Sequence, residues 1–500
     1  MSVIESIHVD GLWRTAGAGG TRDILDPADA SVLAVVAEGD AADTDTAVAA
    51  ARAAFDRGPW PHTPVTERAA LLRRVADLLQ RDREDIALVE SRDTGKTLEE
   101  GRVDVDDVTA AFRYFADLVV NESGGRVVDA GSPDVHSVVV HEPVGVCAMI
   151  TPWNFPLLQA SWKVAPALAA GNTFVIKPSE ITPMSTLHLV KLLVEAGLPA
   201  GVANLVTGPG DPVGARLSEH PDVDLVSFTG GLVSGTKVAA AAAPTVKKVA
   251  LELGGKNPNV VFADICATQE GFDLAVDQAL NAAFIHSGQV CSAGARLIVE
   301  ESVRDRFVAE LAARARKIRL GRGTEEGVEC GPLVSEQQLA KTEAYVASAL
   351  GDGAVLRCGG ERPEPTASRP ESGYFYSPTV LDHCHRGMKV VREETFGPLL
   401  TVETFSGEDQ AVELANDTEY GLAGAVFAAD TARARRVAAR LRHGTVWIND
   451  FHPYLPQAEW GGFGKSGVGR ELGPHGLAEY RETKHVYENL RPAPVRWFAG

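Results

Sequence analysis

Chemistry can start at Cys291, which stands in the stretch Gly288-Gln289-Val290-Cys291-Ser292-Ala293-Gly294. Small residues on both sides let a substrate approach the thiol closely, which a cysteine packed inside a leucine-rich helix would not allow. A thiolate is a strong nucleophile, whereas a cysteine whose pKa is not lowered is a small apolar filler. Taken alone, the stretch also fits a buried structural cysteine, so other parts of the chain must decide.

Two further polar residues follow short apolar runs that predict strands. Asn154 lies in Thr151-Pro152-Trp153-Asn154-Phe155-Pro156, directly after a run that ends at Ile150, and its amide can donate to an oxyanion. Glu252 follows Val249-Ala250-Leu251, so it is a candidate general base whose pKa burial would raise. The alternatives are an ordinary turn asparagine and a surface glutamate at the end of a strand.

Two other stretches have residue types that bind dinucleotides. In Lys177-Pro178-Ser179-Glu180, the lysine and the glutamate can both hydrogen-bond ribose hydroxyls. A carboxylate there would repel a 2′-phosphate, which favours NAD over NADP. Phe228-Thr229-Gly230-Gly231-Leu232-Val233-Ser234-Gly235 predicts a strand, a glycine turn and a helix whose N-terminus can bind a pyrophosphate. It lacks the GxGxxG spacing, and the first stretch also fits a solvated charged turn.

The elements that must position these residues alternate between short apolar runs and helical patterns, which is typical of βαβ units and a parallel sheet. The predicted strands are 134–141, 146–150, 173–177, 202–206, 225–228, 260–262, 297–300 and 484–487. The predicted helices include 40–57, 66–92, about 102–119 and 302–318, and residues 360–373 predict a proline-rich surface loop.

Composition limits the possible partners and location. The 500 residues carry a formal net charge of −19, with 45% hydrophobic and 23% charged residues. Nucleic acids and anionic membranes need a basic surface, so we expect neither as a partner. The six cysteines show no CxxC spacing, which fits a reducing, cytoplasmic compartment and gives no metal site. We expect no signal peptide in Met1–Glu5 and no transmembrane helix.

Together with Glu394-Thr395-Phe396-Gly397-Pro398, these stretches closely resemble the NAD(P)-dependent aldehyde dehydrogenase superfamily over about residues 8–495. The resemblance implies an α/β fold with two doubly wound domains and a small β oligomerisation extension. The NAD-binding domain would comprise 1–122 and 145–258, the catalytic domain 259–479, and the extension 123–144 and 480–500. It further implies a homodimer or homotetramer in which the tail strand extends a neighbour's sheet.

The resemblance also assigns roles. Cys291 would attack the aldehyde, Asn154 and the Cys291 backbone N–H would bind the oxyanion, and Glu252 would activate water and help to deprotonate the thiol. Lys163 and Glu471 match a pair thought to relay protons. The residues expected to contact the cofactor are Thr151, Pro152, Trp153, Lys177, Ser179, Glu180, Gly230, Gly231, Gly235, Leu253, Glu394 and Phe396.

For the substrate, a small-molecule aldehyde, the segments 286–294 and 445–471 resemble bacterial betaine-aldehyde dehydrogenases. Aromatic faces can hold a quaternary ammonium by cation–π attraction. The candidate aromatic residues are Phe155, Trp162, Phe451 and Trp460, of which the first two are seven residues apart on one face of a predicted helix. The carboxylate of Glu459 could attract the cation or simply be solvated. The alternatives are an apolar core or tunnel, an ω-aminoaldehyde dehydrogenase, and a non-catalytic family member. A coenzyme A-acylating enzyme is disfavoured by Glu252.

Two features depart from the family pattern. Gly231 stands where serine is frequent, which removes one possible pyrophosphate contact. The interval from Glu252 to Cys291 is longer than usual, and we expect the extra residues, around Ile265–Phe272, in a surface loop. Neither departure changes the assigned roles.

Overall fold

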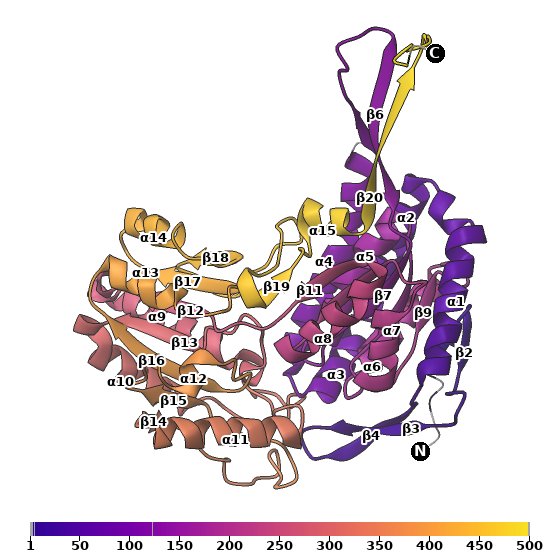
Figure 1. Cartoon of the computed structure of the whole chain (residues 1–500). Coiled ribbons are helices and arrows are strands. Elements are labelled where there is room, and N and C mark those ends of the chain that lie inside the picture. Colours follow the sequence, from indigo (N-terminus) through magenta and orange to yellow (C-terminus); the bar gives the residue numbers. More distant parts are fainter. Residues whose placement is uncertain (1–3, 5, 123, 499–500) are drawn as a thin grey trace.

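The structure is a computed structural model that describes residue 4 and residues 6–122 and 124–498. Two α/β blocks stand side by side, and an antiparallel extension projects from the first block (Figure 1). Within the described residues, no helix has the length and apolarity needed to cross a membrane. Of Met1–Glu5 only Ile4 is described, so the expectation about a leader lies outside the described residues.

The first block is built on an eight-stranded sheet whose five central strands run parallel. Most of their residues are buried, as expected for parallel strands covered on both faces. The outer strands are antiparallel to their neighbours. In sheet order the strands are β19 (Gly467–Val468), β11 (Lys248–Glu252), β10 (Leu225–Thr229), β7 (Val146–Ile150), β8 (Thr173–Lys177), β9 (Ala203–Leu205), β1 (Ile7–Val9) and β2 (Leu12–Arg14).

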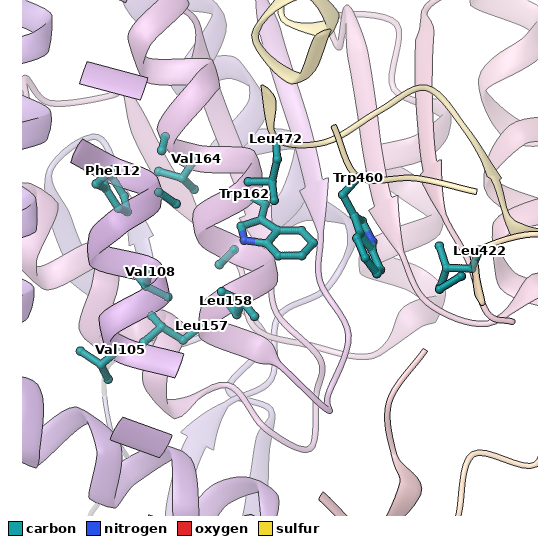
Figure 2. Close-up of a cluster of buried hydrophobic side chains, with 14 of the residues drawn as sticks. Val105, Val108, Phe112, Leu157, Leu158, Trp162, Val164, Leu422, Trp460 and Leu472 are labelled. Carbon is teal, nitrogen blue, oxygen red and sulfur yellow. The ribbon is translucent and has the colours of Figure 1, made fainter. Parts of the chain in front are cut away.

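Helices cover this sheet in two layers. α1, α5, α6 and α8 contact the strands, and α2, α3 and α4 pack outside α5 and α6. Figure 2 shows Val105, Val108 and Phe112 of α4 beside Leu157 and Leu158 of α5. The helices are α1 (Ala41–Arg57), α2 (Val65–Arg81), α3 (Arg83–Thr94), α4 (Leu98–Asn121), α5 (Pro156–Ala170), α6 (Met184–Glu195), α7 (Ala215–Glu219) and α8 (Leu232–Ala242).

The strand order reverses between β7 and β10. From β7 the chain continues to β8 and β9 on one side, and β10 and β11 lie on the other. Open α/β sheets bind ligands beyond the carboxyl ends of the strands at such a switch point. Ile150, Thr229 and Glu252, at the ends of β7, β10 and β11, therefore lead directly into the region where a site is expected.

The second block is built on a seven-stranded sheet that is parallel except for β14. Its strands, in sheet order, are β14 (Val355–Cys358), β15 (Thr379–Asp382), β16 (Leu399–Phe405), β13 (Arg296–Glu300), β12 (Pro258–Val261), β17 (Ala423–Phe427) and β18 (Thr445–Ile448). Its helices are α9 (Gln269–Phe284), α10 (Arg304–Ala315), α11 (Glu336–Gly351), α12 (Lys389–Arg392), α13 (Glu408–Asn416) and α14 (Thr431–Ala438).

The extension is a three-stranded antiparallel sheet of β20 (Arg481–Asn489), β6 (Val135–Pro143) and β5 (Gly125–Val127). β20 runs along the outer edge and ends near the C-terminus (Figure 1). A separate hairpin joins β3 (Thr21–Asp26) to β4 (Ser31–Ala37). After β18 of the second block the chain returns to the first block, where β19 pairs with β11 and α15 (Gly473–Glu479) packs on α5. The domain limits drawn from the sequence stay a prediction.

The expected fold class is confirmed, but two local predictions were wrong. Residues 66–92 form two helices, because the chain leaves helical geometry at Asp82 (φ −97°, ψ 15°), whose carboxylate binds Arg81 and His188. Ile265–Phe272 is partly at the surface, with residues 267–270 exposed, but it is not a loop. It forms a 3₁₀ helix (Ala263–Ala267) and the first turn of α9, and it buries Ile265, Cys266 and Phe272 in the core.

Candidate active site

A cavity of about 660 Å³ opens beyond the carboxyl ends of β7, β8, β10 and β11. This volume is typical of cofactor and small-molecule sites. Most predicted site residues line it: Thr151, Pro152, Trp153, Asn154, Phe155, Lys177, Ser179, Glu180, Gly230, Gly231, Glu252, Leu253, Cys291, Glu394 and Phe396. The predicted residues outside its lining are Lys163, Glu471, Gly235, Trp162, Phe451, Glu459 and Trp460.

The loop that carries Cys291 is fixed to the second sheet by Asn257, which immediately precedes β12. Its Nδ2 donates to the carbonyl of Cys291 at 2.8 Å and to that of Ala293 at 3.0 Å. Its Oδ1 accepts from the backbone N–H of Ala423, the first residue of β17, at 3.0 Å. Sequence reasoning missed Asn257. The available signal was a polar residue in a glycine-rich turn just before an apolar run, which had to find buried partners.

The same loop begins with a left-handed turn. His286 and Ser287 have φ of +47° and +53°, and Gly288 follows with +68°. This conformation costs roughly 1–2 kcal/mol for each residue that has a side chain. A Cβ on Gly288 would lie 2.2 Å from the carbonyl oxygen of Gly397, so this position requires glycine. Such strain persists only where surrounding contacts hold it, as is frequent at functional sites.

Asn154 is brought directly to this loop. Its buried Nδ2 donates to the carbonyl of Gln289, two residues before Cys291, at 2.8 Å. Gln289 is itself held, because its Oε1 accepts from the backbone N–H of Val334 at 2.9 Å. The amide carries a second N–H, which is available to an oxyanion formed at Cys291.

The half-buried Cys291 is a poor thiolate in this state. Burial raises the pKa of its thiol to about 12, and the nearby carboxylates of Glu394 and Glu252 contribute to the increase. Because the thiolate is the nucleophilic form, the thiol needs a base when it reacts.

Glu252 is the carboxylate in position to serve as this base. It ends β11 and is buried, and its Oε2 has no hydrogen-bond partner among the described residues. Burial, followed by the charge of Glu471, raises the pKa of Glu252 well above its usual value, while Lys163 opposes the shift. An unpaired carboxylate with a raised pKa is suited to accept a proton near neutral pH.

Lys163 and Glu471 form a buried ion pair. Lys163 Nζ also donates to Oγ1 of Thr229, the last residue of β10, at 2.7 Å. The backbone of Glu471 exchanges two hydrogen bonds with that of Trp460, at 2.7 and 2.8 Å. The structure therefore brings the predicted relay pair together and connects it to one of the candidate substrate residues.

The part of the cavity expected to hold the nucleotide, next to the N-terminus of α8, is open. Gly231 begins α8, no described side chain caps this helix, and a Cβ on Gly231 would meet nothing within 4 Å. The free N–H groups at the helix N-terminus can bind phosphate. Gly235 lies outside the cavity and serves packing instead, because a Cβ there would lie 2.5 Å from Cδ2 of Leu253.

Lys177 and Glu180 lie together on one wall of this part of the cavity. Lys177 Nζ is 3.4 Å from Oε2 of Glu180 and donates to the carbonyl of Pro178 at 2.9 Å. Burial lowers the pKa of Lys177, and Glu180 partly offsets the effect. Both side chains can reach a ribose that enters the cavity, as their place in its lining indicates.

Glu394 and Phe396 come from the second block. Glu394 accepts from the N–H of Gly255 at 3.2 Å, and burial raises its pKa to about 7, with Lys341 opposing. The ring of Phe396 (φ +56°) packs edge-on against Trp153, with centroids 5.1 Å apart.

Gln338 and Lys341 are among the lining residues that sequence reasoning missed. Gln338 donates from Nε2 to the carbonyl of Phe396 at 2.5 Å, and Lys341 is the residue that opposes the pKa shift of Glu394. Both lie on α11, whose ordinary amphipathic sequence gives no signal for a site.

Three aromatic rings form a mutual cluster. Trp162, Tyr454 and Trp460 lie pairwise edge-to-face, with centroid distances of 5.6, 6.0 and 5.5 Å. Figure 2 shows the ring of Trp162 projecting from α5 toward Trp460. Burial raises the pKa of Tyr454, and the charges of Asp104 and Cys291 add to the shift. Tyr454 and Cys291 pack against the same hydrophobic core, which contains Trp162 and Trp460. Phe451 is buried beside Trp447, at 4.8 Å.

Phe155 is not on the helix face expected from the sequence. It is the residue before α5 and has non-helical geometry (φ −133°, ψ 63°), so the seven-residue spacing to Trp162 does not run along one continuous helix. Its ring packs instead against His286 (5.5 Å) and under Nζ of Lys96 (4.3 Å). Glu459 binds Nδ1 of the exposed His475 at 2.7 Å, and this hydrogen bond lowers its pKa. Of the two interpretations of Glu459, the geometry favours the solvated one.

A nucleophile, an amide donor and an unpaired base around one cavity are the parts needed for acyl transfer. The aldehyde dehydrogenase family model matches residues 13–486. The chain belongs to the aldehyde dehydrogenase family, as the sequence resemblance predicted.

Individual relatives cover almost the whole chain. A betaine aldehyde dehydrogenase of Bacillus subtilis (strain 168) is 54% identical over 494 residues, which cover 99% of each protein. Aminoaldehyde dehydrogenase 2 of Zea mays is 41% identical, covering 98% of this chain and 97% of that protein. The crystal structure of a Staphylococcus aureus betaine aldehyde dehydrogenase in complex with NAD⁺ matches with a TM-score of 0.96 at 48% identity, covering 99% of this chain and 97% of that one.

Proposed function

We propose that this enzyme oxidises betaine aldehyde to glycine betaine, with NAD as the hydride acceptor. The observation that carries the substrate is the cluster of Trp162, Tyr454 and Trp460, which shares one hydrophobic core with Cys291. Aromatic faces attract quaternary ammonium groups, which cannot donate hydrogen bonds. The relatives named betaine aldehyde dehydrogenase support the same substrate.

In the proposed reaction, Sγ of Cys291 bonds to the aldehyde carbon while Glu252 accepts the thiol proton. The second N–H of Asn154 and the backbone N–H of Cys291 donate to the resulting oxyanion, and one such donor is worth ~3 kcal/mol in the transition state. When bound, NAD accepts the hydride that leaves the former aldehyde carbon, and Cys291 then carries a thioester.

The second half of the reaction is hydrolysis. Once Glu252 has released the thiol proton, it takes a proton from the water that attacks the thioester carbon. It passes this proton to the departing sulfur of Cys291, so the thiol is restored and the carboxylic acid leaves. Aldehyde, NAD⁺ and water thus become acid, NADH and a proton. The buried pair Lys163–Glu471, whose charges both act on the pKa of Glu252, is the proposed route by which that proton departs.

The residues of the cavity fit NAD. The uncapped N-terminus of α8, with open space at Gly231, suits a pyrophosphate. Lys177 and Glu180 would hold the adenosine ribose, and Glu394 and Phe396 the nicotinamide side. The carboxylate of Glu180 would repel a 2′-phosphate, which favours NAD over NADP.

We further propose a cytoplasmic homodimer or homotetramer. β20 is a nine-residue edge strand whose side chains are almost all exposed, and a long free edge is a template for pairing with another chain. Exposed apolar residues cluster on this strand and the tail after it, among them Val486, Tyr487, Trp497 and Phe498. The six cysteines are all free, which fits a reducing compartment.

The test is NADH production from betaine aldehyde, 4-aminobutanal and propanal, with NAD and NADP compared for each. We expect the highest kcat/KM with betaine aldehyde and NAD. A higher value with 4-aminobutanal would favour the aminoaldehyde alternative, which the maize relative's name supports. Equal kcat/KM values for all three aldehydes would indicate that the aromatic cluster only lines the substrate tunnel. Cys291→Ala should abolish turnover and leave NAD binding intact, and retained turnover would refute the nucleophile assignment.

A further inference from the structure

A group of buried charges lies behind the site, at the junction of α3, α4 and α5. Lys96 is fully buried, pairs with Asp104, and lies 3.3 Å from Oε2 of Glu90. Glu100, which is half-buried one turn further along, adjoins this group, since its charge contributes to the pKa values of Lys96 and Asp104. None of these residues lines the cavity, and the reaction proposed above uses none of them.

Two contacts connect this group to the two halves of the site. Oε1 of Glu90 accepts from the N–H of Leu157, in the first turn of α5 and three residues after Asn154, at 3.1 Å. Oε1 of Glu100 accepts from the N–H of His286, five residues before Cys291, at 2.7 Å. Lys96 Nζ lies over Phe155, whose ring packs against His286. The group therefore contacts both the oxyanion donor's turn and the nucleophile's loop.

We propose that Glu100 is a positioning residue for Cys291, because it fastens the strained His286–Ser287 turn to the buried charges that also anchor the Asn154 turn. His286 and Ser287 adopt a left-handed conformation that side chains disfavour, so the turn needs a fixed partner. Glu100 is itself immobilised, since its Oε2 accepts from N and Oγ1 of Thr97 at 2.6 and 2.8 Å. The two helices beneath, α4 and α5, pack closely through the buried side chains seen in Figure 2.

The inference rests on the proposed role of Cys291 as the nucleophile. The test makes two measurements. The first is the rate at which iodoacetamide alkylates Cys291, monitored by mass spectrometry, and the second is kcat and KM for propanal. Glu100→Met removes the acceptor and keeps the volume. We expect a loss of about tenfold or more in alkylation rate and kcat, with KM nearly unchanged, because small displacements of a reacting group are costly.

Three variants separate positioning from helix capping. Thr97→Ala removes the N-cap side chain of α4 and its hydrogen bond to Oε2 of Glu100, but it leaves the Thr97 N–H on that oxygen and the Glu100–His286 contact. Glu99→Ala removes an exposed carboxylate from the same turn. Both should alkylate within about twofold of the wild type even where the melting temperature falls. Glu100→Gln keeps an acceptor for His286 and should recover most of the rate.

Equal alkylation in Glu100→Met and Thr97→Ala would overturn the proposal, as would equal losses in Glu100→Met and Glu100→Gln. If Glu100→Met does not fold, Glu100→Asp, which is one methylene shorter and cannot keep both contacts, must show the same loss. Failure of the catalytic assignment would look different: Cys291→Ala would retain turnover, whatever the Glu100 variants do to the alkylation rate.

Discussion

Nδ2 of Asn154 lies 2.8 Å from the carbonyl oxygen of Gln289, which ties the turn after β7 to the nucleophile's loop across 135 residues of sequence. Asn154→Asp keeps the size of the side chain but replaces the donor by an acceptor. Loss of an oxyanion donor lowers kcat by about 100- to 1,000-fold. We expect a decrease of this size for Asn154→Asp with propanal and saturating NAD, and a similar one for Asn154→Ala. A variant that kept a tenth of the kcat would show that this amide is not the oxyanion donor.

Glu252 depends on a glycine opposite its carboxylate. A Cβ on Gly461 (φ +150°) would lie 2.9 Å from Oε1 of Glu252. Gly461→Ala should displace the carboxylate and, like Glu252→Gln, slow hydrolysis more than the first turnover, so the pre-steady-state NADH burst remains while the steady rate falls. Gly353→Ala (φ +96°), where a Cβ meets nothing within 4 Å, is the control for backbone strain alone. Loss of the burst in Glu252→Gln would place this residue before hydride transfer.

Cofactor affinity should depend on pH through Glu394, whose pKa is raised to about 7, chiefly by burial. A carboxylate accepts hydrogen bonds from ribose hydroxyls better than a protonated acid does. The Kd for NAD, measured by fluorescence, should therefore fall as pH rises through about 7 and level off above it. Glu394→Gln should weaken binding and flatten the profile. Glu393→Gln, at the exposed neighbouring position, should keep the wild-type profile. A sloping profile in Glu394→Gln would assign the titration to another group.

The aromatic cluster should discriminate between charged and neutral aldehydes. A desolvated cation–π contact is worth about 2 kcal/mol, which corresponds to roughly 30-fold in KM. Trp460→Leu should raise KM by about this factor for betaine aldehyde and by much less for propanal. Trp60→Leu, at a tryptophan buried in the η1 turn Trp60–His62, is the control for loss of packing alone. Equal effects of Trp460→Leu on the two aldehydes would contradict a cation site.

Much of the site could be predicted because its candidate residues lie in short, local stretches of sequence. The stretches with Asn154, Lys177, Gly230 and Glu252 lie at the ends of strands of the parallel sheet, and the carboxyl ends of such strands meet at one edge. Asn154, Lys177, Gly230 and Glu252 are therefore predicted to lie together before any contact is known, and the structure lines one cavity with them. The family resemblance added Glu394 and Phe396, which reach the cavity from the second block.

Phe155 and Ile265–Phe272 show where pattern reasoning failed. A seven-residue spacing aligns two side chains only inside a continuous helix, and Phe155 lies just before α5 begins. The long interval from Glu252 to Cys291 suggested a loop. Its apolar residues extend the core instead, because the free energy gained by burying them exceeds the conformational entropy lost in ordering the segment.

The sequence by itself determined the family and the α/β class and predicted the reacting groups, because these depend on residue types at short spacing. The tertiary structure alone decided which distant residues hold them. Asn257 binds the Cys291 loop across 34 residues, Glu100 binds His286 across 186, and Lys163 meets Glu471 across 308. A buried polar group must find a partner, but nothing in a local stretch specifies which one. That choice is made only when packing brings the two segments into contact.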